Sequence, residues 1–131
     1  MVIFFCLLAV VVQSDSKKGA SCFEGKSVLE VDTFLVSPDP PLKNSNLHLD
    51  LEGGLSQVED ITQLTWQVHR NGDFYEQEEV QLTDPCPGGQ CTIKHDFFIK
   101  GTTLSGNYVM KVLLMNSKNT EVSCWQFEYS L

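Results

Sequence analysis

The five cysteines are the residues of this chain whose type and spacing most directly imply chemistry. Cys6 lies in an apolar opening stretch, and the other four, Cys22, Cys86, Cys91 and Cys124, lie in the rest of the chain. In an oxidising compartment, an even set of cysteines in a small domain forms disulfides. A zinc site would be the competing use, but there is one close pair and its spacing does not suit zinc. We therefore expect disulfides and no metal site.

Four cysteines allow three pairings, and the turn residues favour one of them. Between Cys86 and Cys91 the chain reads Pro-Gly-Gly-Gln, a turn-forming segment that can bring the two sulfurs together. Cys22 would then pair with Cys124 and tie the start of the domain to its last strand. In the chain-entropy model, a disulfide that closes a loop of about 100 residues contributes roughly 4–5 kcal/mol.

The three histidines give little support to catalysis. His48, His69 and His95 each stand alone in a strand-like pattern, with no metal-ligand spacing between them. We expect each to be a solvated or hydrogen-bonded strand residue. The chain also lacks a Gly-x-Ser-x-Gly elbow and a phosphate-cradling glycine loop.

Three nearby carboxylates, Glu76, Glu78 and Glu79, could imitate the paired acids of a glycosidase. However, Glu76 and Glu78 are expected to alternate outwards on a strand, where a solvated face is the simpler explanation. With the cysteines in disulfides, no thiol nucleophile is left in the domain. The sequence therefore predicts a protein that is not an enzyme and that needs no cofactor.

The charge balance excludes nucleic acid as a partner. The chain has nine basic and seventeen acidic residues, a net charge of −8, and Arg70 is its single arginine. A nucleic-acid binder needs a basic face that releases counterions from phosphates.

The opening stretch predicts export. Residues 2–12 are all apolar, which suits the central region of a signal peptide and is too short to span a bilayer. Val12 and Ser14 stand at the −3 and −1 positions of a cleavage site before Asp15. The segment before the apolar run has no Lys or Arg, and a buried strand or helix is the alternative. We expect a signal peptide (residues 1–14), a polar leader (residues 15–21) and one domain (residues 22–131). The protein would be secreted, or enter the lumen of the endosomal, lysosomal or vacuolar system.

Alternating apolar and polar residues divide this domain into strands. Ser37 and the prolines after it end the first strand, Gly53-Gly54 is expected to stop the second, and Asn71-Gly72 marks a tight hairpin. No helical period is present. The pattern predicts an all-β fold, an immunoglobulin-like sandwich of two antiparallel sheets, with a closed barrel as the alternative. The expected strands cover residues 29–35, 47–51, 64–68, 74–82, 93–99, 108–115 and 125–129.

The order of these landmarks resembles the ML (lipid-recognition) domain family. Its members include the Niemann–Pick type C cholesterol carrier, the ganglioside activator protein and phosphatidylglycerol/phosphatidylinositol transfer proteins. The resemblance covers residues 22–131. It rests on residues 22–26 (CFEGK), 36–41 (VSPDPP), 84–91 (DPCPGGQC), 104–108 (LSGNY) and 124–127 (CWQF).

The resemblance implies two sheets that are splayed so that a lipid tail lies in an apolar cavity between them. It also implies the disulfides Cys22–Cys124 and Cys86–Cys91. The extra disulfides of the cholesterol carrier and the ganglioside activator are absent, so the identity of the lipid stays open among sterols, phospholipids and glycolipids. From strand alternation, and not from the family, the residues expected to line the cavity are Leu49, Leu51, Leu64, Trp66, Val68, Phe97, Ile99, Tyr108, Met110, Val112, Trp125 and Phe127.

The function expected from the resemblance is lipid binding or transfer without covalent chemistry. Its partners would be the lipid ligand, a membrane in transient contact, and in one version a protein acceptor or receptor. Phe98, which is out of phase with Phe97, is either a lip residue that touches the membrane or a residue packed under a loop. The alternative function is a secreted immunoglobulin-like protein-interaction module with a solid core.

Overall fold

The computed structural model describes residues 17–131, and the expected signal peptide (residues 1–14) lies outside the described residues. Within residues 17–131, the helix η1 (Pro87–Gly89) has three residues, and no helix is long and apolar enough to cross a membrane. The strands are β1 (Ala20–Ser21), β2 (Leu29–Ser37), β3 (Ser45–Leu55), β4 (Ile61–Arg70), β5 (Asp73–Gln81), β6 (Gln90–Ile99), β7 (Asn107–Asn116) and β8 (Glu121–Ser130).

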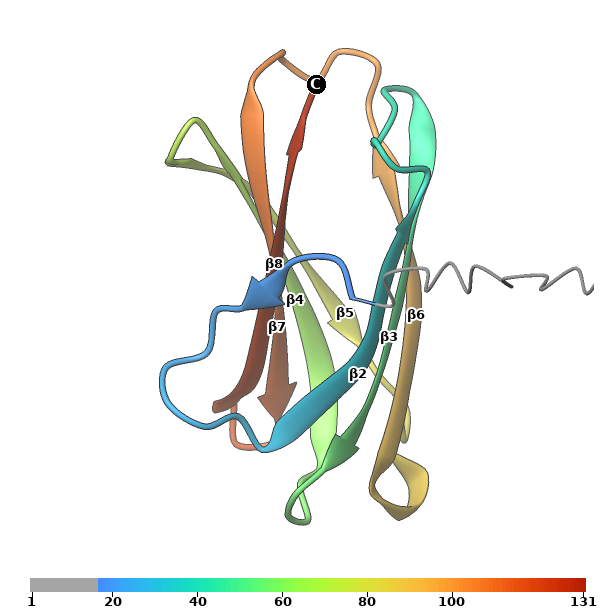
Figure 1. Cartoon of the computed structure of the whole chain (residues 1–131), viewed down its shortest axis with the longest axis vertical. Coiled ribbons are helices and arrows are strands. Elements are labelled where there is room, and N and C mark those ends of the chain that lie inside the picture. Colours follow the sequence, from blue (N-terminus) through green and yellow to red (C-terminus); the bar gives the residue numbers. More distant parts are fainter. Residues whose placement is uncertain (1–16) are drawn as a thin grey trace, which may run out of the picture.

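The strands form two antiparallel sheets that face each other (Figure 1). The larger sheet has the order β1-β8-β7-β4-β5, and the smaller has the order β2-β3-β6. This confirms the predicted all-β fold of two packed sheets. A closed barrel would need a strand ladder that joins the two sheets, and the strand order of residues 17–131 contains none.

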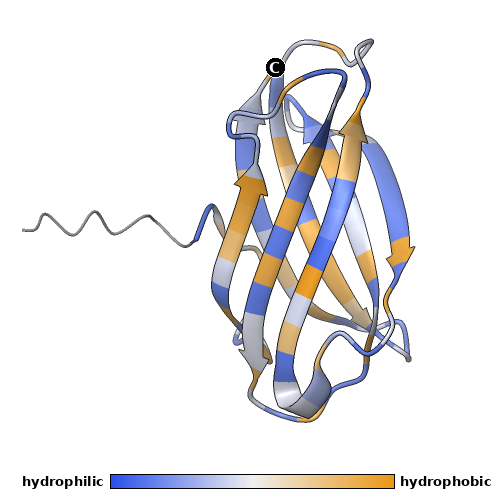
Figure 2. Cartoon of the chain, turned by 90° about the vertical axis from the view of Figure 1, so that its right-hand side faces the viewer, coloured by the Kyte–Doolittle hydropathy of each residue, from blue (hydrophilic) through white to orange (hydrophobic). Residues whose placement is uncertain are grey.

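Each sheet buries one face against the other. On β3, Leu47, Leu49 and Leu51 are at most 2% exposed, whereas the residues between them lie nearer the solvent. Figure 2 shows the same alternation of apolar and polar residues along the strands of the smaller sheet. Burying a leucine side chain contributes roughly 1.5–3 kcal/mol, so these rows of side chains hold the two layers together.

The glycine pair in β3 does not end the strand, and the prediction that it would is wrong. β3 continues to Leu55, and Gly53 pairs with Val31 on one side and Cys91 on the other. A Cβ atom at Gly53 would lie 2.3 Å from the carbonyl oxygen of Glu30. Glycine is therefore used here for a close backbone approach next to an irregularity in β2, and not as a strand breaker.

The predicted hairpin at Asn71-Gly72 joins β4 to β5. Both residues have positive φ angles, 49° and 89°, as the favoured two-residue hairpin turn requires. Three residues further on the register shifts, because Val68 faces Glu76 whereas His69 faces Phe74. Tyr75 is thus the extra residue of a β-bulge, a feature that re-aims side chains.

Two disulfides close the domain, Cys22–Cys124 and Cys86–Cys91. They are the pairings expected from the turn chemistry. The described part of the leader is docked onto the sandwich, because β1 pairs with β8 and the Lys18 carbonyl accepts a 2.7 Å hydrogen bond from the Trp125 indole.

Candidate ligand cavity

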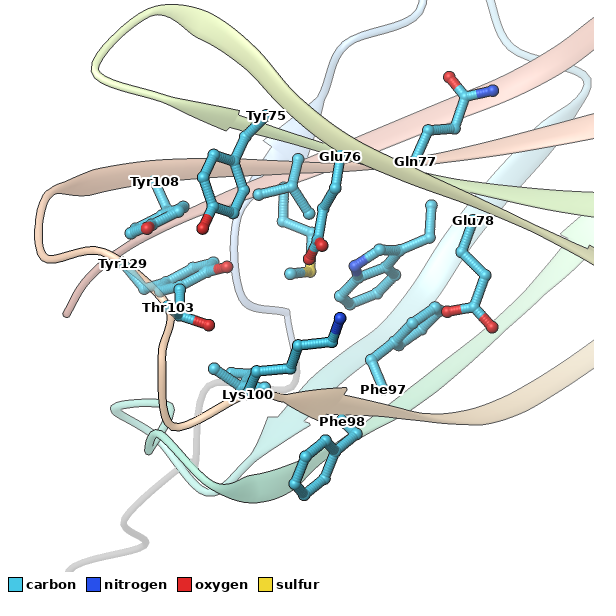
Figure 3. Close-up of a pocket in the computed structure, with 14 residues that line it drawn as sticks. Tyr75, Glu76, Gln77, Glu78, Phe97, Phe98, Lys100, Thr103, Tyr108 and Tyr129 are labelled. Atoms are coloured by element: carbon cyan, nitrogen blue, oxygen red, sulfur yellow. The ribbon is translucent and has the colours of Figure 1, made fainter.

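A cavity of about 290 Å³ lies between the two sheets, at the end of the sandwich that carries the β4–β5 turn and the β6–β7 loop. The larger sheet contributes side chains from β4, β5, β7 and β8, and the smaller sheet contributes the end of β6 (Figure 3). The lining consists of Trp66, Val68, Tyr75, Glu76, Gln77, Glu78, Phe97, Phe98, Ile99, Lys100, Thr103, Tyr108, Met110 and Tyr129.

The apolar part of the cavity is organised by one aromatic pair that joins the sheets. Trp66 of β4 and Phe97 of β6 stack with ring centroids 3.4 Å apart and planes tilted by 16°. Trp66 also meets Phe127 edge-on at 6.2 Å, and Phe127 belongs to the solid core. The stacked pair therefore bounds the cavity on the side of the core. Val68 and Met110, which are paired across β4 and β7, extend the apolar wall.

Tyrosines form the other end of the lining. The Tyr108 and Tyr129 rings stack at 5.2 Å, and Tyr75 meets Tyr108 edge-on at 5.6 Å. The Tyr108 hydroxyl donates a hydrogen bond to the Leu104 carbonyl oxygen, which fixes the β6–β7 loop over this end. Burial raises the pKa of both Tyr108 and Tyr129 above the ordinary tyrosine value. Both phenols therefore stay neutral in neutral solution.

Glu76 and Glu78 of β5 are exposed to solvent, as predicted, but they face the cavity, so the prediction that they point outwards is wrong. They lie opposite Val68 and Trp66, and directly opposed residues share one face of a sheet. Both carboxylates line the cavity. β5 is an edge strand, so solvent reaches its inner face and the two charges are hydrated.

β5 and β6 are edge strands of the two sheets, and residues of both line the cavity. The Nε2 atom of His95 on β6 lies 4.0 Å from a carboxylate oxygen of Glu78 on β5, so this pair approaches across the gap between the sheets. The His95 ring packs edge-on against Phe97 at 4.4 Å. Its Nε2 atom is buried and has no hydrogen-bond partner. His95 therefore differs from the solvated or hydrogen-bonded residue that the sequence predicted.

The other two histidines match that expectation. His48 pairs with Asp96 directly across β3 and β6 on the outer face, and the Nε2 atom of His69 lies 3.0 Å from the Gln67 side-chain oxygen. Within residues 17–131, no group of three histidine, cysteine or acidic side chains is placed to hold a metal ion.

The structure brings together half of the residues that alternation proposed for the cavity. Six of them line it, and the other six do not. Leu49, Leu51, Leu64, Val112 and Phe127 fill the solid core beyond the Trp66–Phe97 pair, each at most 2% exposed. Trp125 lines a second hollow, between β8 and β2. The six that line the cavity are Trp66, Val68, Phe97, Ile99, Tyr108 and Met110.

Alternation did not identify the polar lining. Tyr129 follows Trp125 and Phe127 at every second position of β8. The same alternation could therefore have placed it on the inner face of the sheet. For Glu76 and Glu78 the available signal was their parity with Val80 and Leu82, which pack against the core. Phe98, considered as a lip residue, is 58% exposed and lies at the rim of the cavity. Lys100 and Thr103 follow β6, which ends at Ile99, and no strand period applies to them.

Comparison with solved structures finds chains of similar fold. The crystal structure of a Niemann-Pick type C2 protein from Japanese carpenter ant aligns with a TM-score of 0.56, and the alignment covers 86% of this chain and 97% of that chain. The two proteins share a fold. The sequence identity is 16%, at which the likeness speaks for the fold alone. No protein-family model matches the chain, and no curated protein matches its sequence.

Proposed function

We propose that this protein binds a lipid non-covalently, with the apolar part of the lipid between the two sheets. The observation that carries the proposal is the cavity beside the Trp66–Phe97 pair, because a protein-interaction module with a solid core would have no such space. The cavity volume of about 290 Å³ lies just below the roughly 300–1,000 Å³ of typical ligand pockets. It suits one hydrocarbon tail or one compact apolar body, with the remainder of the molecule at the mouth.

The energetics favour such a ligand. Each methylene that leaves water contributes roughly 0.8 kcal/mol, so a tail of a dozen carbons contributes roughly 10 kcal/mol before the costs of association. The same tail would fill space between the sheets, so the loaded protein should be more stable than the empty one.

Export and transport complete the proposal. The two disulfides belong to an oxidising compartment, and the apolar opening stretch supplies the signal for it. The protein would then carry its lipid outside the cytosol, between membranes or from a membrane to a protein acceptor. The fold shared with a Niemann-Pick type C2 protein supports this proposal.

The test is whether lipid co-purifies with the protein and whether that lipid is bound in the cavity. Mass spectrometry of an organic extract of purified protein should detect a lipid. Met110→Trp places a larger side chain in the cavity and should lower the extracted lipid at least tenfold. Lys111→Trp, its neighbour on the opposite face of β7, is the matched control and should retain the lipid.

Tryptophan fluorescence gives a second reading that does not depend on co-purified material. Trp66 lines the cavity and Trp125 does not, so lipid titrated into delipidated protein should change the fluorescence of the Trp125→Phe variant but not of Trp66→Phe. A protein that yields no lipid and shows no saturable fluorescence change would overturn the proposal.

A further inference from the structure

Residues 17–21, the described part of the leader, are bonded to both sheets and are called the strap below. On the larger sheet, β1 pairs with β8. On the smaller sheet, Lys17 forms a parallel bridge with Phe34 of β2, and the Lys18 backbone N–H donates a 2.8 Å hydrogen bond to the Phe34 carbonyl oxygen. Figure 1 shows this segment, in blue, crossing from the smaller sheet to the larger. The strap therefore joins β2 of one sheet to β8 of the other.

Side chains add to the backbone contacts of the strap. The Lys18 Nζ atom lies 2.7 Å from both carboxylate oxygens of Asp39, in the loop after β2. The Lys18 carbonyl accepts the hydrogen bond of the Trp125 indole on β8. Gly19 lies so close to β8 that a Cβ atom there would be 2.0 Å from the Gln126 carbonyl oxygen. These contacts resist any separation of the two sheets on this side of the sandwich.

A continuous row of aromatic rings leads from the strap to the cavity. Phe34 and Trp125, which both hydrogen-bond the strap, have ring centroids 5.8 Å apart. Phe34 also contacts Phe127 at 5.8 Å. Phe127 in turn contacts two rings of the cavity lining, Trp66 at 6.2 Å and Tyr129 at 5.6 Å. Close-packed interiors transmit strain, so a displacement of the sheets at the strap reaches the cavity wall through this row.

The strap and a ligand in the cavity both depend on the separation of the sheets. The cavity is present while the strap is docked, so the docked strap is compatible with a bound ligand. Release of the strap would let the sheets splay and would draw apart the walls that contact the ligand.

We propose that docking of the strap is coupled to ligand binding: the docked strap slows release of the ligand, and the bound ligand holds the strap in place. This inference rests on the proposed function and adds control of ligand release by a segment outside the cavity lining. Such a coupling is reciprocal. The factor by which docking raises the ligand affinity is also the factor by which the ligand favours docking.

The first experiment displaces the strap without altering the cavity lining. Gly19→Ala places a methyl group against the Gln126 carbonyl oxygen, and Gly25→Ala is the matched control. Both glycines have positive φ angles, 85° and 79°, so both variants strain the backbone, but a Cβ atom at Gly25 meets nothing within 4 Å.

Dissociation of the neutral fluorescent probe N-phenyl-1-naphthylamine is followed after dilution of loaded, previously delipidated protein. We expect Gly19→Ala to release the probe about fivefold faster than the wild type, or faster still, and Gly25→Ala to stay within about twofold of the wild type.

Cleavage by endoproteinase Lys-C measures the coupling in the other direction. Lys18 lies in the strap, whereas Lys26 lies in the exposed segment before β2 and is the internal control. Proteolysis of a folded protein requires local opening. Saturating probe should therefore slow cleavage after Lys18 about fivefold and leave cleavage after Lys26 unchanged.

A second pair of variants replaces the first if Gly19→Ala does not fold. Asp39→Asn removes the ion pair of Lys18 and should release the probe about twofold faster than Asp32→Asn, which removes an exposed carboxylate of β2. Equal release by the two variants of the pair used, or equal protection of Lys18 and Lys26 by the probe, would overturn the coupling and leave lipid binding intact. If the wild type neither binds the probe nor yields a lipid on extraction, the proposed function fails and the coupling fails with it.

Discussion

At the scale of single residues, Tyr129 links the chemistry of the cavity to the stability of the fold. Its pKa is raised above the ordinary value of 10.0, first by burial. Above that pH the unfolded chain releases the phenol proton while the folded protein keeps it, so the unfolded state binds fewer protons. The free energy of unfolding must then fall as the pH rises from about 10.

The Tyr129→Phe variant tests this linkage. Phenylalanine has no proton to release, so the fall of the free energy of unfolding between pH 9.5 and pH 11.5 should be shallower than in the wild type, by up to about 1.4 kcal/mol per pH unit. Urea unfolding across this range measures it. Tyr108, whose pKa is also raised, still titrates in the variant and leaves a residual slope. Identical slopes in the two proteins would contradict the burial of the Tyr129 phenol.

Some cavity residues could be predicted from the sequence and others could not. Trp66 and Phe97 were predictable because each lies in an unbroken alternating strand, in which parity alone decides the buried face. Glu76 was not predicted, although it shares its parity with Val80 and Leu82, because charged residues of a strand are ordinarily assigned to the solvent face and an edge strand can turn them inwards. The stacking of Trp66 on Phe97 could not be predicted, because it is a contact between two sheets whose strands are distant in sequence.

At the scale of elements, the contact between β2 and β3 depends on which of two adjacent glycines is substituted. A Cβ atom at Gly53 would lie 2.3 Å from the Glu30 carbonyl oxygen, a contact that the backbone cannot keep. A Cβ atom at Gly54 would meet its first neighbour, the Gln90 side chain, at an ordinary 3.8 Å. Gly53→Ala should therefore lower the free energy of unfolding by roughly 1–3 kcal/mol.

Gly54→Ala is the control for that prediction. It adds the same methyl group at the next residue of the same strand, where there is space, and should change stability by less than about 1 kcal/mol, in either direction. Chemical denaturation of the two variants gives the comparison. If both variants lose equal stability, the cause is the loss of glycine flexibility and not the close approach of β2.

Most strand ends could be predicted from the sequence. Proline after Ser37 and the Asn71-Gly72 pair mark real strand ends, because both act through local backbone chemistry. The glycines of β3 led to a wrong strand end. A single sequence does not distinguish a glycine required for close backbone approach from a glycine that ends a strand. The bulge at Tyr75 was invisible for a similar reason, because a shift of register is defined by the partner strand.

At the scale of the whole molecule, the net charge of −8 decides how a lipid carrier would meet a membrane. Around neutral pH the protein should be repelled by an anionic bilayer. Acidification to pH 5, close to the sequence pI of about 4.7, reduces the net negative charge and with it that repulsion. Sedimentation with vesicles of phosphatidylcholine, with and without phosphatidylglycerol, should therefore show binding to the anionic vesicles that increases from pH 7 to pH 5. Binding to the neutral vesicles should change much less.

Salt separates this long-range effect from a change in the protein itself. Exposed charges more than about 10 Å apart are screened at 0.1 M ionic strength, so added salt at pH 7 should raise binding to the anionic vesicles towards the value on neutral ones. A rearrangement between the edge strands β5 and β6, for instance at His95 and Glu78, would instead change binding to both kinds of vesicle. If acid increases binding to both kinds equally, net charge is not what controls the encounter with a membrane.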